Sequence, residues 1–145
     1  MIAEDLNNYS NSNIFIMNPI KNTLINQGLF YKIVYSNSLF TSNGLYIKIP
    51  LTNTKYLNGR LIYNIEDNTN VLNQIVNIEN FILDKIINKK KIHHKIYDQI
   101  KNGNIKTNNS NSEVILKISG IWENDNSVGI SYKIITINNT LNLIN

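Results

Sequence analysis

The sequence predicts a mostly β domain with a helical insert, in the order strand, strand, strand, helix, strand, strand. Three observations support this fold class. Three runs between residues 29 and 65 are rich in β-branched and aromatic residues, and in the second run apolar and polar residues alternate with the period of a half-buried strand. The period then becomes helical between residues 70 and 101. Finally, two alternating runs flank the polar segment Glu123–Ser127 and predict a closing hairpin at 112–137.

The composition is that of one globular domain. The chain has 145 residues, of which 42% are hydrophobic, and it contains no cysteine. Disulfides, thiolate chemistry and cysteine zinc sites are therefore excluded. No apolar run reaches the roughly 18 residues that cross a bilayer. The N-terminus lacks the basic and apolar regions of a signal peptide. We expect a soluble, intracellular protein without a membrane partner.

The first half of the chain predicts an arm followed by β-structure. Residues 1–13 are polar and predict a loose arm ahead of a single domain at 14–137. The run Ile14–Met17, ended by Asn18-Pro19, predicts an added edge strand. Strands one, two and three are predicted at 29–35, 45–51 and 60–65, with a loop at 36–44 and a turn at 52–59. In strand two, Leu45, Ile47 and Ile49 share one face, while Tyr46 and Lys48 share the other.

A helix is predicted at 70–88, preceded by the good N-cap residues Asp67, Asn68 and Thr69. Its apolar stripe is Leu72, Ile75, Val76, Ile82, Leu83 and Ile86, interrupted only by Glu79. The spacing of Ile92, Ile96 and Ile100 predicts a shorter helix at 91–101, closed by Gly103. A polar loop is predicted at 102–111 and a C-terminal tail at 138–145.

The closing hairpin alternates clearly. In its first run Val114, Leu116 and Ile118 oppose Ile115, Lys117 and Ser119, and in its second run Ile130, Tyr132 and Ile134 oppose Ser131 and Lys133. Such alternation predicts a sheet with one packed face and one wet, basic face.

Five strands with a helical segment between the third and fourth are the order of the OB-fold, a partly open five-stranded barrel. OB barrels bind oligonucleotides on strands two and three, beside the one–two and four–five loops. Basic residues hold phosphates there, and rings stack on bases. The candidate nucleic-acid-binding residues are Phe40, Tyr46, Lys48, Arg60, Lys117, Trp122 and Lys133. The alternatives are a solvated face for Tyr46 and Lys48, a core position for Trp122, and a subunit contact for Phe40.

Charge and motifs favour binding over catalysis. The net charge of +4 and the pI near 9.2 permit a polyanionic partner. The chain lacks a phosphate-binding glycine loop, a Gly-x-Ser-x-Gly elbow and a His-Glu-x-x-His motif. His93 and His94, as helical neighbours, would point about 100° apart and could not clamp one ion. We therefore predict no enzymatic activity, no metal and no cofactor.

The basic run Lys89–Lys91 is either a solvated junction or an extra phosphate contact.

Several segments together resemble one protein family. GLYIKIP, NGRLIYNI, VLNQIVNIENFILDKIINKK, KIYDQIKNG and EVILKISGIWENDNSVGISYKI are similar to the OB-fold single-stranded DNA-binding proteins of nucleocytoplasmic large DNA viruses, which are distantly phage-like. The resemblance spans about residues 28–137, and residues 113–137 carry most of it. In that stretch, Gly120-Ile-Trp122 and Gly129-Ile-Ser-Tyr-Lys133 match the family's closing motif.

The resemblance implies a protein of viral DNA replication and recombination that coats unwound strands and contacts the polymerase. Its place would be the host nucleus or a cytoplasmic viral factory. Two departures are a shorter segment before the hairpin and a C-terminus without the acidic tail that recruits partners.

Two functions of different classes follow. The first is a sequence-tolerant binder of single-stranded DNA, with RNA, homo-oligomers and replication proteins left open as partners. The second is a structural or protein-docking module, such as a virion or assembly subunit, that uses Leu39 and Phe40.

Overall fold

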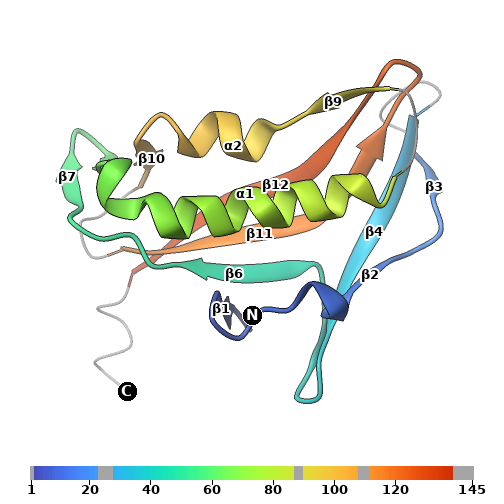
Figure 1. Cartoon of the computed structure of the whole chain (residues 1–145), viewed down its shortest axis with the longest axis horizontal. Coiled ribbons are helices and arrows are strands. Elements are labelled where there is room, and N and C mark those ends of the chain that lie inside the picture. The colour runs from blue at the N-terminus through green and yellow to red at the C-terminus, as the bar shows by residue number, and fades with distance from the viewer. Residues whose placement is uncertain (1, 23–27, 87–89, 108–111, 139–145) are drawn as a thin grey trace.

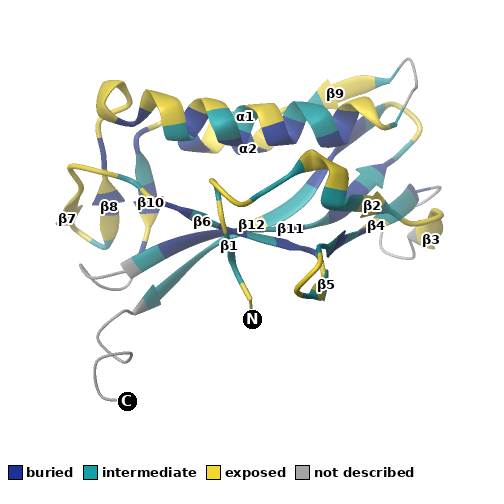
Figure 2. Cartoon of the chain, turned by 60° about the horizontal axis from the view of Figure 1, so that its bottom comes forward, coloured by how far each residue is buried: buried dark blue, intermediate teal, exposed yellow. Residues whose placement is uncertain are grey.

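The computed structural model describes residues 2–22, 28–86, 90–107 and 112–138. Over these residues the protein is mostly β, with a helical layer packed on one face of the larger of two sheets (Figure 1). The layer consists of α1 (Thr69–Asp84) and α2 (Lys95–Ile100). Figure 2 shows both helices on the same side of that sheet. The predicted class, mostly β with a helical insert, is confirmed.

The larger sheet is organised around β11 (Ser112–Glu123) and β12 (Ser127–Asn138), which form the predicted closing hairpin. On the other side of β11, β6 (Leu45–Ile49) pairs with its first half and β4 (Gly28–Ser36) pairs with its second half. The remaining strands lie at the edges: β1 (Glu4–Asp5), β2 (Ile14–Ile16), β3 (Ile20–Asn22), β5 (Thr41–Asn43) and β9 (Lys91–His93). β1 pairs with β6 in parallel, β9 pairs with β12 in parallel, and β2, β3 and β5 pair with β4.

The predicted third strand belongs to a different sheet. Only its first residues form a strand, β8 (Arg60–Ile62), which pairs with β7 (Lys55–Leu57) and β10 (Asn104–Lys106). β7 lies where a turn was predicted. The β7–β8 turn is made by Asn58 and Gly59, with φ of 53° and 76°, which suits a tight hairpin. The two sheets do not close on each other, so the predicted five-stranded barrel is not confirmed.

The helical segment also differs from its prediction at one place. The first helix is confirmed at Thr69–Asp84, and the predicted residues 87 and 88 lie outside the described residues. Residues 91–93 were predicted to be helical but form β9, and Ile92 is 39% exposed. Pairing with Ser127–Gly129 of β12 overrides the helical spacing there. Ile96 and Ile100 are buried in α2, as the spacing indicates.

Glu79 interrupts the apolar stripe of α1 because it caps α2. The side chain is fully buried, and its carboxylate accepts the backbone N–H groups of Ile96 at 2.9 Å and Tyr97 at 3.2 Å. The residue at the N-cap of α2, His94, makes no side-chain capping bond. A side chain from another helix therefore satisfies the free N–H groups of α2. Burial raises the pKa of Glu79, although the two N–H bonds act in the opposite direction.

The N-terminal segment, predicted to be a loose arm, is packed against the domain over residues 2–13. β1 extends the sheet beside β6, and Leu6 and Tyr9 pack against the core. The ring of Tyr9 stacks on that of Tyr35 at 5.8 Å. The core lies between the helices and the sheet, and its centre includes Ile33, Leu45, Ile47, Ile75, Ile82, Ile96, Leu116, Ile118 and Ile121. The predicted C-terminal tail lies outside the described residues from 139 onward.

Candidate nucleic-acid interface

The larger sheet presents two different faces. Along β11, Val114, Leu116 and Ile118 belong to the core under the helices. Successive residues of a strand point to opposite faces, so Lys117 points away from the helices. We call this second surface the open face. By register it carries Phe30, Lys32, Tyr46, Lys48, Lys91, His93, Ile115, Lys117, Trp122, Lys133 and Ile135.

A β-bulge in β11 decides on which face the tryptophan lies. The register of β11 against β12 shifts between Ile118 and Gly120. Because one residue is inserted, the alternation changes phase, and Ile121 rather than Trp122 enters the core. Trp122 is half-buried and lies outside the core cluster. Its ring is therefore on the same face as Lys117.

Three rings form a row across four strands of the open face. Phe30 on β4 is the register partner of Trp122 on β11. On the other side, the ring of Trp122 lies 5.7 Å from that of His93 on β9. The strand between them, β12, contributes Gly129, the register partner of both Trp122 and His93. We call Phe30, Trp122 and His93 the ring row.

Two glycines make room for these rings. A Cβ atom at Gly129 would lie 2.6 Å from Cζ2 of Trp122. A Cβ atom at Gly120 would lie 2.5 Å from Cζ of Phe30 and 2.3 Å from the backbone oxygen of Tyr31. The Trp122 and Phe30 rings therefore occupy the space that a side chain at these two positions would fill, and a larger residue there would displace them.

Two lysines face each other further along the same hairpin as the ring row. Lys117 and Lys133 are register partners across β11 and β12. On its other side Lys117 pairs with Tyr46, and its Nζ lies 5.5 Å from the centre of that ring. Among the described residues, no carboxylate is within ion-pair distance of either lysine. Like charges directly opposite each other destabilise a sheet by roughly 0.2–1 kcal/mol. The pair therefore lowers the stability of the sheet locally, and no acidic side chain among the described residues offsets this repulsion.

The other basic residues of the open face differ in their surroundings. Lys48 is held between Asp5 at 4.0 Å and Glu113 at 3.7 Å, so its charge is already balanced. Lys32 and Lys91 are exposed and lie by register near the ends of the ring row.

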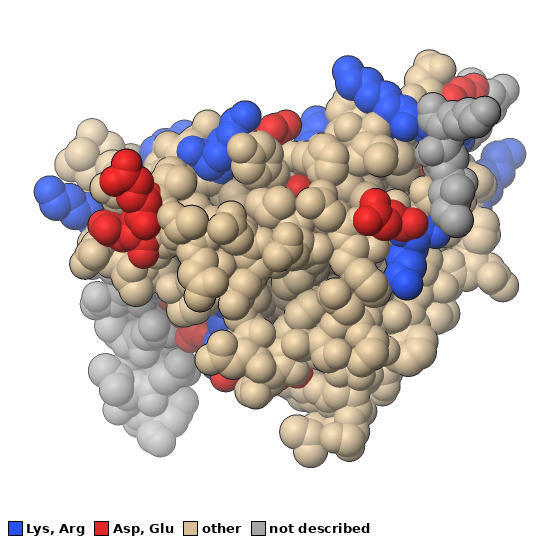
Figure 3. Space-filling view, viewed as in Figure 1, with Lys and Arg blue, Asp and Glu red and all other residues tan. Residues whose placement is uncertain are grey.

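The helix side of the molecule differs from the open face in its distribution of charge. Figure 3 shows a broad uncharged area at the centre of that side, with scattered Lys and Arg and with acidic residues among them.

Four of the seven predicted residues lie on the open face without an acidic partner: Tyr46, Lys117 and Lys133 are neighbours in register, and Trp122 lies further along β11. Lys48 is on the same face, although it is paired with acids. Arg60 is separate, because it lies on β8 of the smaller sheet, where its Nη1 donates to Oδ1 of Asn104 at 2.8 Å. Phe40 is partly buried against the core, 6.0 Å from the Tyr35 ring, whereas its neighbour Leu39 is 87% exposed.

Sequence reasoning missed Phe30 and Lys32, although alternation within the predicted strand one was a usable signal, because both oppose the buried Ile33. It named Lys91 only within the basic run Lys89–Lys91, and it considered His93 as a metal ligand. Their place on the open face had no local signal, since the segment has helical spacing and becomes a strand only by pairing with β12.

One end of the ring row is supported by a buried carboxylate on the core face. Glu123 accepts a hydrogen bond from the Tyr31 hydroxyl at 2.7 Å and forms an ion pair with Lys90 at 2.9 Å. The hydrogen bond to this carboxylate raises the pKa of Tyr31 to about 12. The network ties β4, β11 and the start of β9 together directly behind the ring row.

In the described part of the chain, no helix has both the length and the apolar character needed to cross a membrane. Comparisons of this chain with protein-family models, with curated proteins and with solved structures find no match.

Proposed function

We propose that this protein binds single-stranded DNA on the open face, without catalysis and with tolerance for sequence. The observation that carries the proposal is that aromatic rings and uncompensated lysines share one face of the sheet, while the other face is covered by helices. Single strands are held by this combination, in which stacked rings contribute about 1–3 kcal/mol per base and basic residues follow the phosphates.

The opposed lysines give the phosphates a defined place. A phosphate between Lys117 and Lys133 would replace their repulsion with two favourable contacts. Further along the same face, the ring row offers Phe30 and Trp122 as stacking surfaces, with His93 at its end. Every base has a π-face, so stacking of this kind discriminates little between sequences.

The resemblance to viral OB-fold single-stranded DNA-binding proteins fits this proposal at the closing hairpin. The two halves of the matching motif are register partners, and Gly129 provides the space that the Trp122 ring occupies. On this proposal the chain is a divergent OB-like protein of viral DNA replication and recombination. It would work in the host nucleus or a viral factory, with replication proteins as partners.

The direct test is a titration with an oligo-dT, a duplex and an RNA of equal length at two salt concentrations. Trp122 is the only tryptophan, so its fluorescence reports the open face without a label. We expect oligo-dT to quench this fluorescence and to bind more tightly than duplex. The logarithm of affinity should fall with that of salt at about −0.7 per phosphate contact.

Charge-reversal variants locate the interface. The double variant Lys117→Glu/Lys133→Glu should lose at least about tenfold in affinity and show a shallower salt dependence. The matched control is Lys55→Glu/Lys106→Glu, which makes the same change in net charge on exposed residues of the smaller sheet. Equal losses in both variants would mean that only net charge matters, and the open face would then not be the site.

A docking module is the second candidate function, and exposed apolar side chains favour it. Leu39 is 87% exposed, and Phe15, Met17 and Ile20 on or beside β2 and β3 are 48%, 41% and 61% exposed. Light scattering after size exclusion, with and without oligo-dT, separates the two functions. An oligomer that forms without DNA, ignores it, and dissociates on Leu39→Ser would favour docking.

A further inference from the structure

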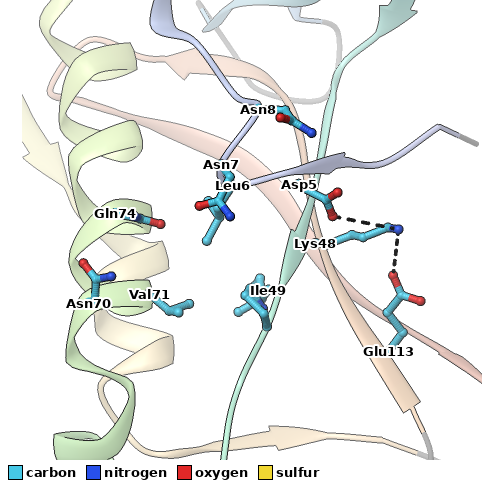
Figure 4. A pocket seen from close by; sticks show the side chains of 11 residues that line it. Asp5, Leu6, Asn7, Asn8, Lys48, Ile49, Asn70, Val71, Gln74 and Glu113 are labelled. Carbon is cyan, nitrogen blue, oxygen red and sulfur yellow. Dashed lines mark ion pairs between the residues drawn. The ribbon is translucent and has the colours of Figure 1, made fainter.

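A cavity lies away from the ring row, between the N-terminal segment, α1 and β6. Its volume is about 550 Å³, and its walls come from Asp5–Asn8, from the first turns of α1 and from the end of β6. Figure 4 shows Asn70, Val71 and Gln74 on α1, with Leu6 and Asn7 of the N-terminal segment and Ile49 of β6 across from them. The proposed function does not use this cavity.

Four carboxamides line the cavity and have no hydrogen-bond partner within the described part of the chain: Asn7, Asn8, Asn70 and Gln74. Amides of both kinds occur elsewhere in the described chain: the side chains of Asn73 and Asn77 on α1 also have no hydrogen-bond partner, whereas other amides are engaged. The side chain of Asn68, for example, accepts from the N–H of Thr52 and donates to two carbonyl oxygens. The Asn124 side chain likewise accepts two N–H bonds in the β11–β12 turn. The amides of the cavity are therefore free to serve a ligand.

The wall between these amides is aliphatic. Leu6, Ile49 and Val71 contribute to it, and Leu6 and Val71 also pack against the core, which holds them in place. A surface of this kind contacts a flat, apolar ring face. A small number of polar groups around an apolar wall is the usual composition of a small-molecule site.

The charges of the cavity disfavour an anion. Lys48 is its one basic lining residue, and its Nζ is held between Asp5 and Glu113, which also line the cavity. One positive and two negative groups leave a net charge of −1 on the wall. A phosphate would have to compete with two carboxylates for Lys48.

We infer that this cavity binds a nucleobase, presented either by a free nucleoside or by a strand of nucleic acid. A carboxamide offers a donor and an acceptor in one plane, which matches the edge of a base. Asn and Gln pair in this bidentate way with N6 and N7 of adenine. Adenine is thus the preferred base, with its ring face against the aliphatic wall.

The experiment is nuclear magnetic resonance of the full-length protein, following the side-chain NH₂ signals during titration with adenosine, thymidine or adenosine 5′-monophosphate. Adenosine should move the signals of Asn70 and Gln74 and bind more tightly than thymidine. The monophosphate should bind more weakly than adenosine. Gln74→Ala or Asn70→Ala should weaken adenosine at least about fivefold. Asn73→Ala is the matched control, because Asn73 is exposed on α1 and does not line the cavity.

Three outcomes would overturn the inference: no movement of these signals at millimolar adenosine, tighter binding of the monophosphate, or an equal effect of Asn73→Ala. Titration with oligo-dA in place of adenosine shows whether a base within a strand enters the cavity. The Lys117→Glu/Lys133→Glu protein should still bind adenosine. Failure of the cavity and failure of the open face are therefore distinguishable.

Discussion

The two faces of the central sheet are built from the same strands and differ in almost everything else. Toward the helices, β11 places aliphatic residues that are completely buried, such as Leu116 and Ile118. Toward the open face, the same strand places the buried Ile115 together with Lys117 and Trp122, and the neighbouring strands add rings and lysines. The helix face is optimised for stability. The open face holds two lysines in opposition and two rings over glycines, features that a purely structural face does not need.

The largest expected effect contrasts neighbouring residues on the two faces. Leu116→Ala should lower the free energy of unfolding by about 2–5 kcal/mol, because it leaves a cavity at a fully buried site. Lys117→Ala, one residue away, should change it by less than about 0.5 kcal/mol. Urea unfolding followed by circular dichroism measures both. Equal losses would mean that the open face is also packed.

Glu79 tests whether the helix layer depends on its buried cap. Glu79→Ala should cost about 1–3 kcal/mol, because the N–H groups of Ile96 and Tyr97 lose their acceptor. Glu79→Gln keeps one acceptor and should cost less.

The same carboxyl predicts a dependence on pH. Burial raises the pKa of Glu79 in the folded protein above its value of 4.5 in the unfolded chain. The contribution of this group to stability is therefore present below pH 4.5 and is lost as the pH rises through the pKa of the folded state. The free energy of unfolding of the wild type minus that of Glu79→Gln should therefore be lower at pH 7 than at pH 4. Unfolding free energies of both proteins at the two pH values measure this, and a constant difference would contradict it.

The glycines under the rings sharpen the comparison on the open face. Gly120→Ala should cost roughly 1–3 kcal/mol, because its Cβ would meet the backbone oxygen of Tyr31, which cannot move aside. Gly129→Ala should cost less, because the Trp122 side chain can swing away from the new Cβ. The expected signature of Gly129→Ala is a red shift of Trp122 emission with weaker binding of oligo-dT. An unchanged spectrum would place the ring elsewhere.

The smallest effect has opposite signs for stability and binding. Lys133→Gln removes the charge opposite Lys117 and should raise the free energy of unfolding by about 0.2–1 kcal/mol. It should at the same time weaken oligo-dT binding and remove about one phosphate contact from the salt dependence. Thermal unfolding and fluorescence titration measure the two. If stability falls, the lysines do not repel each other in the folded protein.

Much of the local structure followed from periodicity. Alternation predicted β4, β6 and the β11–β12 hairpin, and helical spacing predicted α1. It also predicted the wet, basic face with Tyr46, Lys117 and Lys133. These features depend on residues close in sequence, whose spacing directly reports the faces of a strand or helix.

The errors share another cause, which is pairing between distant segments. Arg60 was placed beside Lys48, but β8 pairs with β7 and β10 instead of β6. Trp122 was predicted as a binding residue, but the bulge after Ile118 that places it on the open face cannot be read from simple alternation. Phe40 looked free among Ser, Thr and Asn, yet it packs against Tyr35.

By itself, the sequence determined that this chain forms amphipathic strands and one long amphipathic helix, because side-chain period is a local property. Only the tertiary structure determined which strands are neighbours and on which face of the sheet each ring lies. It also showed that the carboxyl group in the apolar stripe of α1 caps α2. Those choices depend on hydrogen bonds and packing between residues far apart in the chain. The spacing of neighbouring residues carries no record of such contacts.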